Sequence, residues 1–312
     1  MNKSCYEENL TTRAVWYYYF AEKTQQEIAD ILGLSRIKVV RLLDQAKQDG
    51  VIQFRIRPEN QRVLNLEKEF IERFHLEDIF IVPSVADNPN ENVARAAACY
   101  LEEHLPESGF INIGYGDTVK RILNHLSIPS ERDISIVALT GGINYYVRYS
   151  EFVNKGTSID MHSRLHLVPS PLVVSSASMA EMLRAEPSIR QIEDMTRRAE
   201  MSVVSIGSVT AAATMMTEGT LSPEDLHWLE SHHAAGDILG NYVDDNGQPV
   251  DFPMRERMMT SPLEKLREMK NVVGVSGGLI KARGIAGALK SGIFNVLITD
   301  ADTAEAVLSI VS

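Results

Sequence analysis

Three basic side chains, Arg36, Lys38 and Arg41, stand close together in a segment where all three can project to solvent. They alternate with apolar residues, and Asp44 is the only acidic residue in the basic stretch that continues to Lys47. Guanidinium and ammonium groups on one helix face suit the base edges and phosphates of DNA. The segment therefore predicts a helix that reads DNA through Arg36, Lys38 and Arg41.

A second pair of side chains could bind a small molecule. Lys281 follows Gly277 and Gly278 at the expected start of a helix, where a cation and glycine amides together suit a phosphate group. Asp237 stands between two glycines and could accept hydrogen bonds from sugar hydroxyls. Each residue has a plainer interpretation, because Lys281 could be a solvated surface lysine and Asp237 could be a helix N-cap.

Two short helices joined by a tight turn are expected to position the basic residues, in the stretch QQEIADILGLSRIKVVRLL. Thr24 and Glu27 form a capping-box pattern at the start of the first helix, and Gly33 suits its end. Ser35 is a good N-cap for the second helix. This is the spacing of a helix-turn-helix, whose second helix enters the major groove. An ordinary helical hairpin with a basic face is the alternative.

The flanking segments extend this interpretation. Residues 11–21 predict another helix, whose aromatic rings should mostly belong to the core. Tyr18, near the end of that helix, and Gln25, at the start of the next one, could each contact a DNA phosphate.

A strand is expected directly after the two helices, because polar and apolar residues alternate over residues 51–57. A helix-turn-helix followed by a strand resembles the winged arrangement. Arg55 and Arg57 could then touch the DNA backbone.

An amphipathic segment, residues 60–74, follows Pro58, which is expected to end the DNA-binding unit. Its apolar stripe could pair with a second subunit, and operators read by this motif are usually two-fold symmetric. The expected organisation is a DNA-binding domain over residues 1–57, a linking and dimerisation helix over 58–77, and an effector-binding domain over 78–312.

From Asp78 onward, apolar runs end in glycine-containing turns and are followed by helical segments. The runs are DIFIVPS, FINIGYGDTV, ISIVALTGG, LHLVPSP, MSVVSIGS, VVGVSGG and NVLITD. Strands that alternate with helices predict a doubly wound, mainly parallel α/β sheet whose glycine turns line up at one ligand-binding edge. The third glycine of a dinucleotide fingerprint and a Walker lysine are both missing, which counts against a nucleotide-binding module.

Composition limits the class of protein. The 312 residues are 44% hydrophobic and 23% charged, typical of a globular protein. The net charge of −11 divides into +1 over residues 1–60 and −12 over the remainder, so only the N-terminal part should touch DNA. Cys5 and Cys99 form no metal or disulfide pattern. Since a signal peptide and an apolar span are also missing, a cytoplasmic protein without metal, cofactor or membrane contact is expected.

The motifs together resemble the SorC (SorC/DeoR-type) family of transcriptional regulators almost from end to end. The segments that carry the resemblance are TQQEIADILGLSRIKVVRLLDQAKQDGVIQFRI, IGYGDT, LTGG, PSPLVVSS, IGS, GDILGNYVD, GGLIKARGIAGALKSG and NVLITDADTA. The resemblance implies a homodimeric or homotetrameric regulator that binds double-stranded operator DNA and a phosphorylated sugar or sugar-like effector. It implies a repressor of an operon for uptake or catabolism of a sugar or a quorum signal.

The resemblance also assigns site residues. DNA-facing positions fall on Tyr18, Gln25, Ser35, Arg36, Lys38 and Arg41. Effector-pocket positions fall on Gly114, Gly116, Thr118, Gly141, Gly142, Asp237, Leu239, Gly278 and Lys281. One motif departs from the family, because the common GGENK is GGLIK here and lacks a carboxamide and a carboxylate beside the pocket.

A sugar-phosphate isomerase-like enzyme is the alternative function, because the family's effector domain is similar to such isomerases. An enzyme needs a general base beside the substrate carbon. The pocket motifs offer Asp117 and Asp237 but no cluster of acidic or histidine residues at a strand end, and the enzyme interpretation leaves the helix-turn-helix unexplained. No catalytic residue is therefore predicted.

Overall fold

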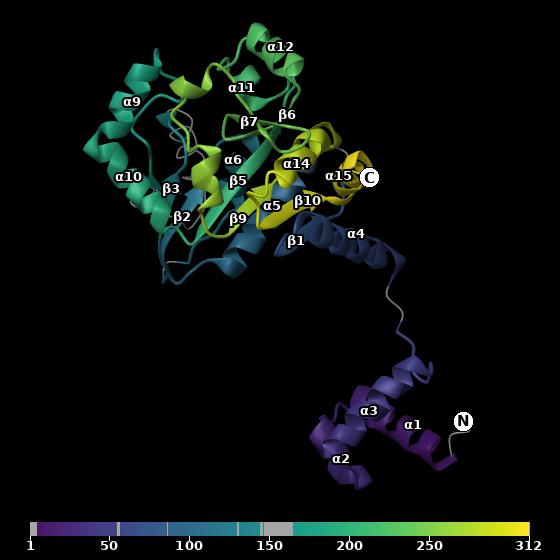
Figure 1. Ribbon diagram of the computed structural model, residues 1–312. Coiled ribbons are helices and arrows are strands. Elements are labelled where there is room, and N and C mark those ends of the chain that lie inside the picture. Colours follow the sequence, from purple (N-terminus) through teal and green to yellow (C-terminus); the bar gives the residue numbers. More distant parts are fainter. Residues whose placement is uncertain are drawn as a thin grey trace. The chain divides into compact units, whose positions relative to one another are not determined.

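A computed structural model describes residues 5–54, 57–85, 87–129, 131–143, 146 and 165–311. The chain divides into two compact units, residues 1–61 and residues 62–312 (Figure 1).

The first unit contains the expected helix-turn-helix. Its helices are α1 (Cys5–Tyr19), α2 (Gln25–Leu32) and α3 (Arg36–Gln48). All three contribute to one apolar core, made of Leu10, Ala14, Val15, Ile28, Ala29, Val39, Leu42, Leu43 and Ala46. The first helix begins six residues earlier than the expected start at residue 11.

The prediction that the aromatic rings of residues 16–20 mostly belong to the core is wrong for three of the five. Trp16 is 54% exposed, Phe20 is 74% exposed, and Tyr18 also lies on the surface. A run of consecutive apolar residues must turn part of its side chains outward on a helix, because only one face meets the core. In α3, Ile37 is likewise exposed and Val39 is buried.

The strand expected over residues 51–57 is wrong where the structure describes it. Residues 51–54 and Arg57 form no strand. Ile52 packs on the helical core, and the ring of Phe54 lies 5.5 Å from the ring of Tyr19. A lone strand is not stable, and the described part of this unit offers no strand for these residues to pair with. Arg55 lies outside the described residues.

Helix α4 (Pro58–Phe74) begins at the proline that was expected to end the preceding unit. Proline fits the first turn of a helix because its missing N–H would have no partner there. Phe70 of α4 is fully buried in the core of the second unit, which attaches the helix to that unit.

The described part of the second unit is built on seven parallel strands. In sheet order they are β1 (Asp78–Val82), β10 (Val296–Asp300), β9 (Val272–Val275), β5 (Met201–Ser208), β2 (Ser108–Ile113), β3 (Asp133–Ala138) and β4 (Leu165–His166). An antiparallel branch leaves β5 through β6 (Ala234–Ile238), β7 (Asn241–Asp244) and β8 (Pro249–Val250). The expected mainly parallel α/β fold is confirmed.

Helices cover both faces of the parallel sheet (Figure 1). On one face, α5 (Pro89–His104) and α6 (Asp117–His125) share a core with Met201 and Val203 of β5. On the other face, α4, α14 (Ala282–Lys290) and α15 (Ala301–Val311) share a core with Val204 and Ile206 of the same strand. The alternation along one strand thus buries both of its sides, as parallel strands require.

Shorter helices complete the unit around the carboxyl ends of the strands. They are α9 (Ala177–Ala185), α10 (Pro187–Arg198), α11 (Thr214–Thr217), α12 (Pro223–Ser231), α13 (Leu263–Arg267) and the single turns η1 (Arg255–Arg257) and η2 (Leu279–Lys281). All of them except α12 contribute residues to the walls of two cavities.

Candidate functional site

The helix-turn-helix has the caps that its sequence predicts. The hydroxyl of Thr24 accepts a hydrogen bond from the Glu27 amide at 3.3 Å, and the Glu27 carboxylate accepts one from the Thr24 amide at 2.8 Å. Gly33 ends α2 with φ +65°, and the Ser35 hydroxyl accepts from the Lys38 amide at 3.3 Å. These contacts fix the angle at which α3 leaves the turn.

The predicted DNA-facing residues fall into two groups. Tyr18, Gln25 and Arg36 line one open surface groove, together with Lys23 and Thr24. The groove lies where the end of α1 meets the starts of α2 and α3.

The other three predicted residues lie on or beside α3. Ser35 is its N-cap, Arg41 is exposed, and Lys38 is half-buried. Arg36 and Arg41, five positions apart, therefore lie on the solvent side of the helix opposite Val39 and Leu42.

The predicted effector residues point to a cavity of about 380 Å³ in the second unit. It lies at the carboxyl ends of β2 and β5, where the strand order changes direction, the usual ligand position in an open α/β sheet. Four predicted residues line it, namely Gly116, Thr118, Asp237 and Lys281.

Lys281 supplies a cation to this cavity. Its Nζ donates hydrogen bonds to Asn90 Oδ1 at 3.0 Å and Thr118 Oγ1 at 3.4 Å, and no carboxylate of the described chain forms an ion pair with it. Burial lowers the pKa of Lys281 to about 8, and the nearby Asp117 opposes this effect. Because Arg121 Nε donates to Asp117 Oδ2 at 2.7 Å, that carboxylate is already paired.

Asp237 lies on strand β6, so its plainer interpretation as a helix N-cap is wrong. Burial raises the pKa of Asp237 to about 7, against the effect of the Gly240 amide, which donates to Oδ1 at 2.6 Å. Leu239 and Gly240 form the turn to β7 with φ +56° and +78°. Two positive φ angles in a two-residue hairpin are typical of a type I′ turn, which holds the carboxyl group at the cavity wall.

Five predicted residues lie outside the cavity lining. Leu239 packs on Gly114, and the Gly278 amide donates to Asp300 Oδ2 at 2.9 Å and Thr303 Oγ1 at 2.8 Å. The Gly278 amide is thus engaged within the fold, and the prediction that it is available to a phosphate is wrong.

Gly141 and Gly142 belong to a different part of the edge. Their amides donate to the carbonyls of Met259 and Ser170 at 2.7 and 2.8 Å. A Cβ at Gly141 would meet the Pro171 carbonyl at 2.4 Å, so glycine serves close packing there.

The cavity also has walls that the sequence motifs did not predict. These are Asn90, Tyr115, Lys120, Ser205, Ser208, Thr214, Thr217, Glu218, Tyr242 and Ile280, among others. The Tyr115 hydroxyl donates to Glu218 Oε2 at 2.6 Å, which joins two sides of the cavity. Tyr115, Ser208, Tyr242 and Ile280 lie within or beside glycine motifs of the sequence, whereas the others carried no local signal.

Within the described ranges, no group of three or more His, Cys, Asp or Glu side chains could hold a metal ion. The same part of the chain contains no helix of the length and apolarity needed to cross a membrane.

Comparison with known proteins identifies a family and several relatives of this chain. Residues 59–309 match a family of sugar-binding domains. The transcriptional regulator LsrR of Enterobacter sp. (strain 638) is 34% identical over 309 residues, which is 97% of this chain and 94% of LsrR. LsrR of Escherichia coli (strain SMS-3-5 / SECEC) is 33% identical over 307 residues, or 97% and 95% of the two chains.

Solved structures show the same fold. The full-length sorbitol operon regulator SorC from Klebsiella pneumoniae superposes with a TM-score of 0.69 at 23% identity, covering 97% of this chain and 98% of SorC. The sugar-binding domain of a transcriptional repressor from Vibrio fischeri gives a TM-score of 0.69 at 26% identity, covering 79% of this chain and 98% of that domain.

Proposed function

Because the chain belongs to the sugar-binding-domain family of transcriptional regulators that includes LsrR and SorC, we propose that it represses transcription under control of a phosphorylated sugar or sugar-like effector. The regulator has a helix-turn-helix unit and a separate unit with the effector cavity. Repression, as the direction of regulation, and a phosphorylated ligand are the two proposed features.

The observation that supports the proposal most directly is that Lys281 has no negatively charged partner among the described residues. Its ammonium group is held in the cavity by two neutral oxygens, and no described carboxylate neutralises it. A phosphate group can supply the negative charge that the Lys281 ammonium lacks, through charge-assisted hydrogen bonds. Thr118 and Asp117 begin α6 at the same wall, so the positive end of that helix also favours an anion.

The rest of the cavity suits the part of a sugar phosphate that carries the hydroxyl groups. Asp237, Thr214, Ser205 and Tyr242 present hydrogen-bonding groups around the same space, and Asp237 can accept from two hydroxyls when ionised. A volume of about 380 Å³ is in the range of small-molecule sites. Since the relative SorC is named for a sorbitol operon, sorbitol 6-phosphate is a suitable first probe beside ribose 5-phosphate and fructose 6-phosphate.

A thermal-shift and calorimetry panel tests the ligand. Each phosphorylated sugar is paired with its plain parent, and a ligand that binds only the folded protein raises the melting temperature. At least one phosphorylated sugar should bind ten times more tightly than its parent. Equal binding of every pair would reject the phosphate assignment.

The proposed DNA contact uses α3 and the groove lined by Tyr18, Gln25 and Arg36. We propose that two copies bind a two-fold symmetric operator and associate through α4, where Leu64 and Ile71 are exposed two turns apart. Sedimentation of a Leu64→Glu/Ile71→Glu variant should show smaller particles than the unaltered protein. An unchanged oligomeric state would place the interface elsewhere.

The isomerase-like enzyme is not favoured, because the relatives of similar length are named transcriptional regulators. Incubation with pentose and hexose phosphates should give no turnover.

A further inference from the structure

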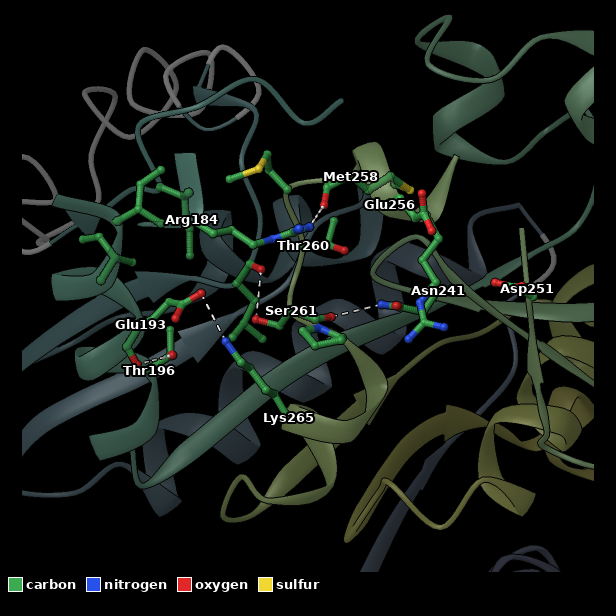
Figure 2. A pocket seen from close by; sticks show the side chains of 18 residues that line it. Arg184, Glu193, Thr196, Asn241, Asp251, Glu256, Met258, Thr260, Ser261 and Lys265 are labelled. Carbon is green, nitrogen blue, oxygen red and sulfur yellow. Dashed lines mark hydrogen bonds and ion pairs between the residues drawn. The ribbon is translucent and has the colours of Figure 1, made fainter. Parts of the chain in front are cut away.

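A second cavity, of about 450 Å³, lies beside the carboxyl end of β3 (Figure 2). Helices α9 and α10 form one side of it, and residues 251–265 form the other. It shares no lining residue with the effector cavity. It therefore needs its own explanation.

The lining of the cavity is mixed, since eight of its 18 residues are apolar and the other ten are polar or charged. Val168, Ile189, Ile192, Met258 and Met259 line it, and Ile189, Met258 and Met259 are buried. These apolar residues favour an aliphatic part in the ligand, because burying apolar surface is favourable and thioether side chains adapt to irregular shapes.

One cation inside the cavity has no countercharge in the described structure. The guanidinium of Arg184 reaches in from α9, and its Nη2 donates to the Met258 carbonyl at 2.6 Å (Figure 2). No described carboxylate forms an ion pair with Arg184, which is half-buried. A guanidinium has five N–H donors in a planar fork, so most of them are available to a ligand.

The other two cations of the lining are already paired. Lys265 Nζ lies 3.1 Å from Glu193 Oε1, and Arg255 Nη2 lies 3.4 Å from Glu264 Oε1. Asp251 and Glu256 are exposed to solvent at the cavity's margin. Among the described lining residues, Arg184 is thus the one cation without an ion-pair partner, which matches a ligand with a single negative charge better than a phosphate dianion.

We propose that this cavity is a second ligand site, which binds a small organic carboxylate with an aliphatic body. The carboxylate pairs with Arg184, since the two planar groups can form parallel hydrogen bonds. The aliphatic body lies along Val168, Ile189 and Ile192. Asn241 forms a fixed part of the wall, because its Nδ2 donates to the carbonyls of Ile238 and Ser261 at 3.0 Å each (Figure 2).

Three small probes separate the two features of the proposed ligand. Hexanoate has both the charge and the aliphatic body, hexanamide has only the body, and acetate has only the charge. In ligand-observed NMR titrations of the full chain, hexanoate should bind at least tenfold more tightly than either of the others. Equal affinity for hexanoate and hexanamide would overturn the proposal.

Variants then locate the binding. Arg184→Gln should weaken hexanoate about tenfold or more, whereas Arg190→Gln, which removes an exposed guanidinium of α10 outside the cavity, should leave it unchanged. Ile192→Trp keeps Arg184 and fills part of the cavity, so it should also weaken hexanoate. Thermal unfolding of each variant checks that it folds.

The effector cavity supplies the remaining control. Lys281→Ala should not change hexanoate affinity, because Lys281 lines only the first cavity. Loss of hexanoate binding in Lys281→Ala, or full retention in both Arg184→Gln and Ile192→Trp, would contradict the second site.

Discussion

Lys281 and Asp237 line one cavity, and burial moves the pKa of each toward neutrality, to about 8 for the ammonium and about 7 for the carboxyl group. Neither group has an ion-pair partner of opposite charge among the described residues. Such a pair of groups is typical of a binding site rather than of a surface, where solvent would hold both pKa values near their usual range.

Lys281→Ala should weaken phosphorylated ligands about ten- to a hundredfold, because a charge-assisted hydrogen bond contributes roughly 1.5–3 kcal/mol. The plain parent sugar should be almost unaffected. Calorimetry of matched pairs measures the difference. Lys290→Ala, at the far end of α14, is the control and should behave as the unaltered protein. Equal weakening of both members of a pair would place the phosphate elsewhere.

Asp237→Asn should change how stability depends on pH. Since the pKa of Asp237 is raised from 3.8 to about 7 on folding, the folded protein binds a proton that the unfolded chain has released. Its contribution to stability therefore falls as pH rises from about 4 to about 7. Asparagine still accepts from the Gly240 amide but does not ionise.

Urea unfolding at two pH values tests this prediction. The Asp237→Asn variant should be more stable than the unaltered protein at pH 8, by on the order of 2 kcal/mol, and similar to it near pH 4. A difference that is the same at both pH values would show that the carboxyl group does not titrate as described.

Helix α3 is the element through which DNA is expected to be read. Its caps fix its start, and its buried side holds Val39 and Leu42 while Arg41 is exposed. Arg41→Ala should cost about 1–3 kcal/mol of operator binding if the side chain contacts a base edge. Gel-shift titrations over several salt concentrations separate this from a phosphate contact, which would weaken all sequences alike and flatten the salt dependence. Full operator affinity in an Arg36→Ala/Lys38→Ala/Arg41→Ala variant would exclude α3 as the reader.

Within the second unit, an ion-pair cluster joins helix α4 to helix α15. Arg62 Nε on α4 donates to Glu305 Oε1 on α15 at 2.5 Å, and its Nη2 lies 3.6 Å from Asp302 Oδ1. At the end of β10, directly before α15, the Asp300 carboxylate accepts from the amide of Gly278, three residues before Lys281. The turn before Lys281 is therefore linked to α15 through Asp300, and α15 is linked to α4 through Arg62.

Arg62→Ala should leave both effector affinity and effector-free operator affinity unchanged but reduce the change that effector causes in operator binding. The ion pair is half exposed, so its loss should cost little stability. Anisotropy titrations of operator with and without ligand measure this coupling. Lys68→Ala, which removes an exposed pair within α4, is the control. An unaltered response in Arg62→Ala would exclude this connection.

The molecule as a whole shows which features the sequence could predict. The parallel strands were predictable because a strand buried on both faces reads as a continuous apolar run, as in β5 and β10. That Gly116, Thr118, Asp237 and Lys281 lie near one another was predictable, because each lies at or beside a glycine-containing turn or strand end of the kind that repeats along the chain. The helix caps at Thr24 and Ser35 were also predictable, because each cap involves residues only three positions apart in the sequence.

The remaining features depend on contacts between distant segments. Tyr115 and Glu218 meet across the cavity although they are 103 residues apart, which no local pattern encodes. The strand expected over residues 51–57 had the right alternation but lacks a partner strand in the described unit. Arg184 carried no signal either, because its significance comes from the cavity that α9 and residues 251–265 enclose.

The account of the whole molecule requires that a phosphate recognised in one unit changes DNA binding by the other. The most direct test is fluorescence anisotropy of an operator selected from random duplexes, bound by the full chain and titrated with phosphorylated sugars and their plain parents. At least one phosphorylated sugar should change operator affinity tenfold or more, its parent should not, and Lys281→Ala should lose most of the response. Equal responses to phosphorylated and plain sugars, or a full response in Lys281→Ala, would contradict the account.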